Sequence, residues 1–175
     1  GDTIKIGRRG SFTGSLIVKG IQGHVGYPDL AENPINSLLK MLEPFAKIYL
    51  DKGTNEFQPS SVMITTIDVN NDASNVIPGE VKAKFNIRFN TLHSVASLQS
   101  MLKNQFDAIT KNYEFNYFCN AEPFLTSDEK IKSTLQNAIT EVVNVNPEKS
   151  TTGGTSDARF ITVSYTHLRA HETSL

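Results

Sequence analysis

One histidine in this sequence is placed for chemistry by the residues around it. His24 lies in the segment Gly-Ile-Gln-Gly-His-Val-Gly-Tyr-Pro at 20–28, directly after an apolar run that predicts a strand. Glycine lets the backbone turn and approach a ligand closely, and Pro28 stiffens the exit of the loop. An imidazole on such a loop can donate a hydrogen bond to a group outside its own core. The alternative, a solvated histidine without a role, stays open on spacing alone.

Arginines and a glycine-rich segment offer a second kind of chemistry, the binding of anions. A guanidinium binds a carboxylate through two parallel hydrogen bonds, so Arg88 and the pair Arg8-Arg9 are candidates for holding an acidic substrate. The segment Thr-Thr-Gly-Gly-Thr-Ser-Asp at 151–157 can turn backbone amides toward a phosphate or carboxylate, although it lacks the lysine of a P-loop. The competing interpretation of Arg88 is an ordinary charge on a solvated sheet face. The competing interpretation of the glycine-rich segment is an ordinary strand-to-helix turn.

The composition excludes several classes of protein. The 175 residues carry 17 Lys and Arg against 18 Asp and Glu, and a net charge of −1 gives no bulk attraction to nucleic acid or anionic lipid. No apolar run approaches the roughly 18 residues of a membrane span, and the N-terminus lacks a signal-peptide pattern. We therefore expect no nucleic-acid or membrane partner and a cytoplasmic location. The one cysteine, Cys119, excludes an intrachain disulfide and lies in an apolar run that predicts a buried thiol.

Hydrophobic spacing predicts the order β-α-β-β-α-β between residues 11 and 120. In the clearest strand, 81–89, apolar residues alternate with Lys82, Lys84 and Arg88, so one face must be buried. The order closes as a four-stranded antiparallel sheet with both helices on its apolar face, a ferredoxin-like domain of the α+β class. The predicted strands span 11–21, 60–69, 81–89 and 113–119, and the predicted helices span 34–45 and 95–109.

Local signals also predict where helices begin and end. Asn33 and Pro34 predict the N-cap and the first-turn proline of the first helix, whose apolar positions at helical spacing are Ile35, Leu38, Leu39, Leu42 and Phe45. Pro44 lies inside this pattern and should kink the helix or end it early, because it removes a backbone donor. Thr126-Ser127-Asp128-Glu129 predicts a capping box for a further helix that bears Leu135 and Val142. That helix has no place in the β-α-β-β-α-β unit, so it should belong to a second domain.

The chain therefore divides into four expected segments. Residues 10–121 form the ferredoxin-like domain, while 1–9 and 122–162 belong to the second domain. Residues 163–175 lack a clear period and are similar to the translated end of a sequencing adapter, which predicts a non-native tail. The sequence starts within a strand pattern without an initiator Met, so we expect a fragment of a longer protein.

Six motifs, in this order over residues 1–162, resemble the succinyl-diaminopimelate desuccinylase family of the dinuclear-zinc amidohydrolases and peptidases. The resemblance implies a dimerisation (lid) domain at 10–121, flanked by pieces of an α/β zinc-peptidase-like catalytic domain. It also implies a homodimer that hydrolyses N-succinyl-LL-2,6-diaminopimelate to succinate and LL-diaminopimelate. The motifs are Gly7-Arg8-Arg9-Gly10-Ser11, Gly23-His24-Val25-Gly26-Tyr27-Pro28, Leu30-Ala31-Glu32-Asn33-Pro34, Asn75-Val76-Ile77-Pro78-Gly79, Phe85-Asn86-Ile87-Arg88-Phe89 and Gly153-Gly154-Thr155-Ser156-Asp157.

The resemblance also implies roles for individual residues. His24 matches the histidine that reaches from the lid of one subunit into the active site of its partner and stabilises the oxyanion of amide hydrolysis. Asn75 matches a second contact from the same lid. The positions that hold the succinyl and diaminopimelate carboxylates are matched by Arg8, Ser11, Arg88, Gly154 and Thr155.

The sequence departs from this family in its metal ligands. Two zinc or cobalt ions are expected in a full-length enzyme, but the family's His-x-Asp motif and Glu-Glu pair are absent here, as is its last histidine ligand. We therefore expect this chain to bind no catalytic metal and to be inactive alone. Alternatives are a related acetylornithine deacetylase or aminoacylase, a non-catalytic dimerisation module, and an amino-acid-sensing domain that shares the same element order.

Overall fold

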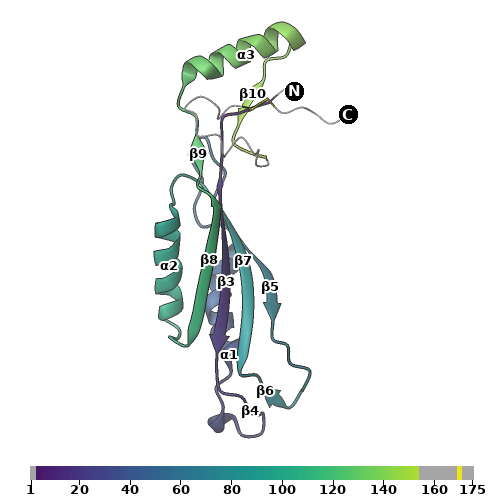
Figure 1. Cartoon of the computed structure of the whole chain (residues 1–175), viewed down its shortest axis with the longest axis vertical. Coiled ribbons are helices and arrows are strands. Elements are labelled where there is room, and N and C mark those ends of the chain that lie inside the picture. Colours follow the sequence, from purple (N-terminus) through teal and green to yellow (C-terminus); the bar gives the residue numbers. More distant parts are fainter. Residues whose placement is uncertain (1–2, 154–168, 171–175) are drawn as a thin grey trace.

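The computed structural model of the chain describes residues 3–153 and 169–170 (Figure 1). Its strands are β1 (Thr3–Lys5), β2 (Gly7–Arg8), β3 (Gly10–Lys19), β4 (Gly23–His24), β5 (Ser61–Asp68), β6 (Val76–Ile77), β7 (Glu80–Phe89), β8 (Tyr113–Ala121), β9 (Phe124–Leu125), β10 (Glu148–Ser150) and β11 (Arg169–Ala170). Its α-helices are α1 (Pro34–Leu42), α2 (Val95–Asp107) and α3 (Glu129–Val143), and two short 3-10 helices are η1 (Pro28–Leu30) and η2 (Glu43–Lys47).

The four long strands form one antiparallel sheet in the order β5-β7-β3-β8. With α1 between β3 and β5 and α2 between β7 and β8, this order is the ferredoxin-like arrangement that the sequence predicts. Both helices contribute side chains to one core cluster with the sheet, so they cover the same face. Its fully buried large side chains include Phe12, Leu16, Val18, Phe85, Ile87 and Phe89 from the sheet and Leu38, Met41, Leu98, Leu102 and Phe106 from the helices.

A glycine on β3 makes room for an aromatic ring of its neighbouring strand. Gly14 is paired with Phe85 of β7, and a Cβ at position 14 would lie 2.3 Å from the Phe85 ring. The ring therefore lies over the β3 backbone and packs against Phe45 from η2, with 5.0 Å between ring centroids. This contact favours one register between β3 and β7, because a shift by one residue would move Phe85 to the solvent face.

The ends of α1 agree with the sequence prediction, whereas its apolar stripe departs at one position. Asn33 accepts a hydrogen bond from the Ile35 amide at 3.0 Å and so caps the helix. The α-helix ends at Leu42, and the chain continues through Pro44 as the 3-10 helix η2, so the predicted early end is confirmed. Leu39, expected on the apolar face, is 57% exposed.

The start of α3 corrects the predicted capping box. Asp128 alone is the N-cap, and its carboxylate accepts from the Ile131 amide at 3.0 Å. Thr126 does not take part, because its amide donates to the Ile6 carbonyl at 2.7 Å. A capping box forms instead at α2, between Ser94 and Ser97, where we did not predict one.

A narrow neck, formed by β2 and β9, joins the four-stranded unit to the remaining elements. The two strands pair antiparallel, with Arg8 opposite Phe124, at the point where the chain enters and leaves the larger sheet. Beyond the neck lie α3 and a small sheet in the order β10-β1-β11, at the end of the molecule away from β4 and β6 (Figure 1). Val142 of α3, predicted as apolar face, is 83% exposed; among the described residues no element covers that end of the helix.

A buried polar network closes the neck end of the four-stranded unit. Asp51 accepts hydrogen bonds from the Gly53 amide at 2.6 Å, the Asn90 amide nitrogen at 2.9 Å and the Ser60 amide at 3.2 Å. Asn90 and Ser60 are fully buried, and the Asn90 backbone amide donates to Ser60 Oγ at 3.0 Å. His93 Nε2 lies 3.2 Å from Asp51 Oδ2. One carboxylate therefore satisfies donors from both ends of the 51–60 loop and from the segment after β7.

The same loop contacts the chain on both sides of the neck. The Arg9 guanidinium donates to the Pro59 carbonyl at 2.8 Å, and Thr151 Oγ1 donates to the Glu56 carbonyl. Gly53 holds the loop in shape at a φ of +81°, where a Cβ would lie 2.6 Å from the Phe57 carbonyl oxygen. The loop thus connects the four-stranded unit to the segment that follows β10.

We expect Asp51→Ala to lower the free energy of unfolding by about 2–3 kcal/mol, because it leaves the buried Asn90 and Ser60 donors without their acceptor. Urea denaturation of the purified chain measures the change. Asp72→Ala, in an exposed position of the 69–75 segment, is the matched control and should change stability by less than about 0.5 kcal/mol. Equal effects of the two substitutions would contradict a central role of Asp51.

The same carboxylate predicts a pH dependence of stability. Burial by itself tends to raise the pKa of Asp51, but hydrogen bonds from Ser60, Gly53 and Asn90 outweigh it and hold that pKa below its usual 3.8. Because the unfolded chain then binds more protons, stability rises with pH in this range; the Asp51 contribution is present above about pH 4 and is lost as pH falls through the native pKa. Urea midpoints of the wild type should therefore fall between pH 5 and pH 2 more steeply than those of Asp51→Asn, and parallel slopes would refute the assignment.

Candidate active site

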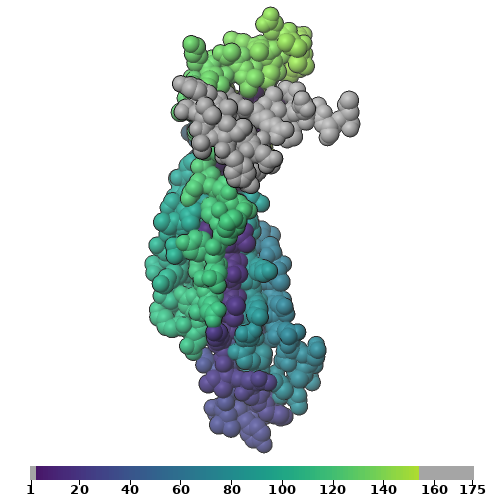
Figure 2. All heavy atoms as spheres, viewed as in Figure 1, coloured from purple at the N-terminus to yellow at the C-terminus, as the bar shows by residue number. Residues whose placement is uncertain are grey.

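His24 is held on a two-stranded ribbon at the far end of the molecule, which we call the tip (residues 20–33 and 69–79). Gly23 and His24 of β4 pair with Ile77 and Val76 of β6, and the Val25 amide donates to the Asn75 carbonyl at 3.0 Å. The tip projects beyond the end of the sheet (Figure 2). The structure therefore brings His24 and Asn75, two of the predicted site residues, next to each other on one exposed ribbon.

The hydrogen bonding of the His24 ring fixes which nitrogen can act outward. Nδ1 accepts a hydrogen bond from the Gly26 amide at 3.0 Å, so in the neutral ring the proton lies on Nε2. A Cβ at position 26 would lie 3.1 Å from Nδ1, which makes glycine the residue that fits this contact best. The Tyr27 ring lies beside the imidazole, with 5.8 Å between centroids. His24 thus presents an Nε2–H donor to solvent.

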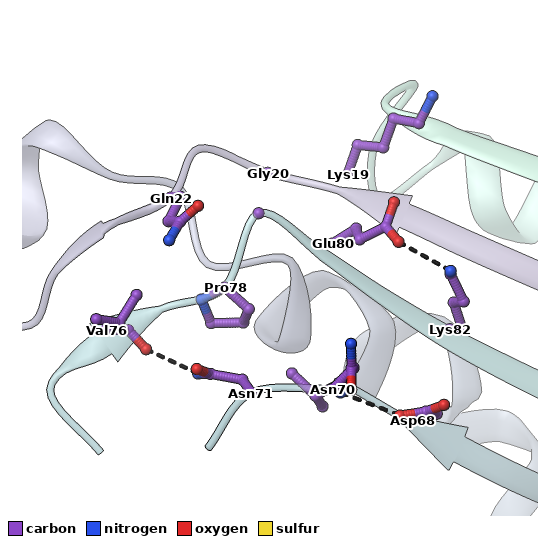
Figure 3. A pocket seen from close by; sticks show the side chains of 12 residues that line it. Lys19, Gly20, Gln22, Asp68, Asn70, Asn71, Val76, Pro78, Glu80 and Lys82 are labelled. Atoms are coloured by element: carbon purple, nitrogen blue, oxygen red, sulfur yellow. Dashed lines mark hydrogen bonds and ion pairs between the residues drawn. The ribbon is translucent and has the colours of Figure 1, made fainter. Parts of the chain in front are cut away.

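A cavity of about 590 Å³ lies at the base of the tip, between the ends of β3 and β7 and the 69–79 segment (Figure 3). Asn71 donates to the Val76 carbonyl at 3.0 Å, and Asp68 accepts from the Asn70 amide at 3.0 Å. Lys82, on its wall, forms an ion pair with Glu80 at 2.9 Å. These contacts fold the segment that carries Asn75 back toward β6, so the cavity walls support the tip.

A second group of predicted site residues, Arg8, Ser11 and Arg88, lies near the neck, and we call it the neck group. Ser11 of β3 is paired with Arg88 of β7, and Arg8 lies three residues before Ser11 in β2. Ser11 is 5% exposed, and its Oγ accepts a hydrogen bond from the Asn86 side-chain amide at 3.4 Å. Arg88 is exposed on the open face of the sheet, and its guanidinium forms no ion pair with another described residue. Arg8 lies with its guanidinium carbon 5.9 Å from the centre of the Phe124 ring.

The neck group carries a concentration of positive charge. Burial and the nearby Arg88 both lower the pKa of Arg9. The Arg9 guanidinium donates to the Pro59 carbonyl and so holds the 51–60 loop. The mutual repulsion of Arg9 and Arg88 favours an anion, above all a carboxylate, beside them.

The two groups are separated by the length of the sheet. Ser11 lies at the neck end of β3 and Lys19 at its other end, and eight residues of extended strand span about 26 Å. His24 lies beyond Lys19, on the tip (Figure 1). The structure therefore does not bring His24 and Arg88 of one chain together. The remaining predicted site residues, Gly154 and Thr155, lie outside the described residues.

The described residues place no group of three or more His, Cys, Asp or Glu side chains where they could hold a metal ion. Burial raises the pKa of the half-buried Cys119 thiol, which disfavours the thiolate that a metal or an electrophile would need. Within residues 3–153, no helix is long and apolar enough to cross a membrane.

Tyr27 lies beside His24, and we did not predict this contact from the sequence. Its only signal in the sequence is its position in the same glycine-rich loop as His24. The ring contact with His24 depends on the turn that is closed by the hydrogen bond from the Tyr27 amide to the His24 carbonyl at 2.9 Å.

A family model described as the peptidase dimerisation domain, M20_dimer, matches residues 6–114. The chain belongs to the M20 peptidase dimerisation domain family. The match covers β2, the strands β3, β5 and β7, the tip, α2 and the first two residues of β8. Both groups of predicted site residues in the described structure therefore lie within this M20 dimerisation domain.

Curated relatives extend the similarity beyond the M20 dimerisation domain. The chain is 49% identical over 165 residues to a succinyl-diaminopimelate desuccinylase of Parvibaculum lavamentivorans, covering 92% of this chain and 42% of that protein. It is 48% identical over 165 residues to one of Pelagibacter ubique, covering 92% of this chain and 43% of that protein. The chain thus spans less than half the length of the curated relatives that it matches.

Solved structures share the fold of the M20 dimerisation domain at low sequence identity. Aminopeptidase PepT from Bacillus cereus matches 90% of this chain and 42% of its own length, with a TM-score of 0.70 and 16% identity. A tripeptidase from Staphylococcus aureus matches 91% of this chain and 42% of its own length, also with a TM-score of 0.70 and 16% identity. At this identity the similarity establishes the ferredoxin-like fold and its flanking elements, not the substrate.

Proposed function

We propose that this chain is part of a metal-dependent amide hydrolase that converts N-succinyl-LL-2,6-diaminopimelate to succinate and LL-diaminopimelate, a step toward lysine and diaminopimelate. The desuccinylases of Parvibaculum lavamentivorans and Pelagibacter ubique, 49% and 48% identical over 165 residues each, support this substrate. Residues 10–121 serve as the dimerisation lid in this proposal, and 1–9 and 122–162 as pieces of the catalytic domain. The complete enzyme works in the cytoplasm.

One observation carries the proposal of a homodimer: the two groups of site residues lie at opposite ends of β3. The substrate is about as long as four extended residues, about 14 Å, whereas Ser11 and the end of β3 are about 26 Å apart. One substrate molecule cannot contact His24 and Arg88 of the same chain across that distance. The tip of one subunit must therefore reach the neck group of a second subunit, and the match to a peptidase dimerisation domain supports this arrangement.

Each group has a distinct task in amide hydrolysis. Attack of water on the carbonyl carbon places a negative charge on the carbonyl oxygen, and the outward Nε2–H of His24 donates a hydrogen bond to that oxygen in the partner's site. Asn75, beside it on the ribbon, supplies a second contact from the same tip. The substrate carboxylates are held by the neck group and the glycine-rich segment, that is by Arg8, Ser11, Arg88, Gly154 and Thr155.

The metal ions of this proposal, two zinc or cobalt, do not fit the described residues of this chain, which bring no suitable donor group together. We assign no metal ligand to the chain. The roles proposed above for His24, Asn75 and the neck group do not require a metal ligand from this chain.

We expect the chain as given to release no succinate from N-succinyl-LL-2,6-diaminopimelate, with or without added zinc or cobalt. Succinate release and metal content after dialysis measure this, with a complete relative as the positive control. Turnover above background, or one or more equivalents of tightly bound metal, would contradict the assignment.

In the complete enzyme, we expect His24→Ala to lower kcat by about 100- to 1,000-fold, the usual cost of removing an oxyanion donor. Metal content should stay unchanged, because Nδ1 of His24 already accepts from the Gly26 amide and the ring lies on the exposed tip. Gln22→Ala, an exposed residue of the same loop, is the matched control and should retain wild-type turnover.

Mixing two inactive variants tests whether His24 acts across the dimer. Subunits with His24→Ala and an intact metal site are combined with subunits that keep His24 but lack a metal ligand. In a mixed dimer the intact metal site receives His24 from its partner, so activity should return after subunit exchange. Failure to recover activity, in dimers shown to be mixed, would mean that His24 serves its own subunit or none.

A further inference from the structure

One side-chain amide on the open face of the sheet holds two hydroxyls of the neighbouring strand. Asn86 of β7 lies opposite Thr13 of β3, and Ser11 lies two residues closer to the neck on β3. The Asn86 side-chain amide donates to Thr13 Oγ1 at 2.9 Å and to Ser11 Oγ at 3.4 Å. An amide nitrogen carries two hydrogens and accepts none, so both hydroxyl oxygens must act as acceptors toward it.

These contacts determine what the Ser11 hydroxyl can still do. Its single hydrogen cannot point at a nitrogen that already donates to the same oxygen, so it must point away from Asn86. Among the described residues, no group accepts a hydrogen bond from Ser11 Oγ. Ser11 is 5% exposed, and buried hydroxyl donors are normally paired. The unused O–H therefore indicates an acceptor that lies outside the described part of the chain.

The neighbours of Ser11 favour an anionic acceptor. Arg88 lies directly opposite Ser11 on β7, and its guanidinium forms no ion pair with another described residue. The Arg9 side chain adds a second positive charge close to Arg88, which lowers the pKa of Arg9. A carboxylate beside Ser11 would accept its O–H and be attracted by both guanidiniums.

From this geometry we infer that Asn86 is a positioning residue for substrate binding, which keeps the Ser11 hydroxyl turned outward as a donor to a substrate carboxylate. Asn86 acts through Ser11 and needs no contact with the substrate. The shorter hydrogen bond to Thr13 holds the amide in the orientation that this role requires. The inference rests on the proposed function in one respect, the contact between Ser11 and a substrate carboxylate.

The test uses the complete enzyme, with binding of free succinate and of free LL-diaminopimelate measured separately by calorimetry. Ser11→Ala identifies the product that contacts Ser11, because that product should bind about tenfold or more weakly. Asn86→Asp keeps the shape of asparagine but offers only acceptors, so the Ser11 hydroxyl should turn inward to donate to it. The same product should therefore again bind about tenfold or more weakly.

Asn116→Asp is the matched control. Asn116 is exposed on the same face of the sheet, opposite Ser15 on β3, and the substitution adds the same charge about 13 Å along the strand from Ser11. This variant should bind both products as the wild type does, because solvent and salt screen a charge at that distance.

A double substitution separates the lost hydrogen bond from the added charge. In a Ser11→Ala background there is no hydroxyl to turn, so Asn86→Asp should weaken binding of the product by less than about threefold further. If the full loss persists in that background, the charge alone causes it, and the inference is overturned.

Kinetics separate this role from a merely structural one. For the N-succinyl substrate, Asn86→Asp should raise KM while kcat stays within about threefold, which indicates lost ground-state binding. Wild-type binding in Asn86→Asp, no effect of Ser11→Ala on either product, an equal loss in Asn116→Asp, or no binding of either product by the wild type would each overturn the inference. Product binding that depends on both Ser11 and Asn86, in an enzyme that does not hydrolyse the N-succinyl substrate, would support the inference and refute the proposed function.

Discussion

The pairing of β3 with β7 is the constraint on which the rest of the structure depends. Ten consecutive residue pairs, from Gly10 opposite Phe89 to Lys19 opposite Glu80, hold the two strands in one register. Their apolar residues face α1 and α2, and a slip by one residue would move all of them to the solvent face. The same register sets Ser11 opposite Arg88 at one end and starts the tip at the other. The core and both groups of site residues thus depend on one set of backbone hydrogen bonds.

The sequence predicts most of the four-stranded unit because its signals are local and periodic. Alternation in 81–89, and the cap and proline at Asn33 and Pro34, identify elements whose order leaves few ways to form a sheet. The ferredoxin-like fold follows from that order. Leu39 shows the limit of the method, since a residue at the edge of an apolar stripe is exposed where no neighbour reaches it.

The polar contacts could not be predicted in the same way. Asp51 and Asn90 are 39 residues apart, and nothing in their spacing indicates that a carboxylate and an amide meet inside the protein. The side chains of Lys5 and Thr152, which form a hydrogen bond at 3.1 Å, are separated by 147 residues. The sequence identifies His24 as an available imidazole, but only the tip geometry shows that Nδ1 is already occupied and that Nε2 is the donor. Such contacts are made by tertiary structure, which joins segments without a repeating pattern.

Because the neck is narrow and far from the tip, a small rotation at the neck moves the tip over a large distance. The two strands of the neck, Gly7–Arg8 and Phe124–Leu125, are the narrow connection between the four-stranded unit and the small sheet with α3 (Figure 1). The ten residues of β3 separate the tip from this connection by about 30 Å. A rotation of about 10° at that connection would carry the His24 ring through about 5 Å, more than the length of a hydrogen bond. The hydrogen bonds of Arg9 and Thr151 to the 51–60 loop lie close to this connection, where a small displacement becomes a large displacement of the distant imidazole. The resistance of the neck to rotation therefore determines how precisely the His24 ring is positioned.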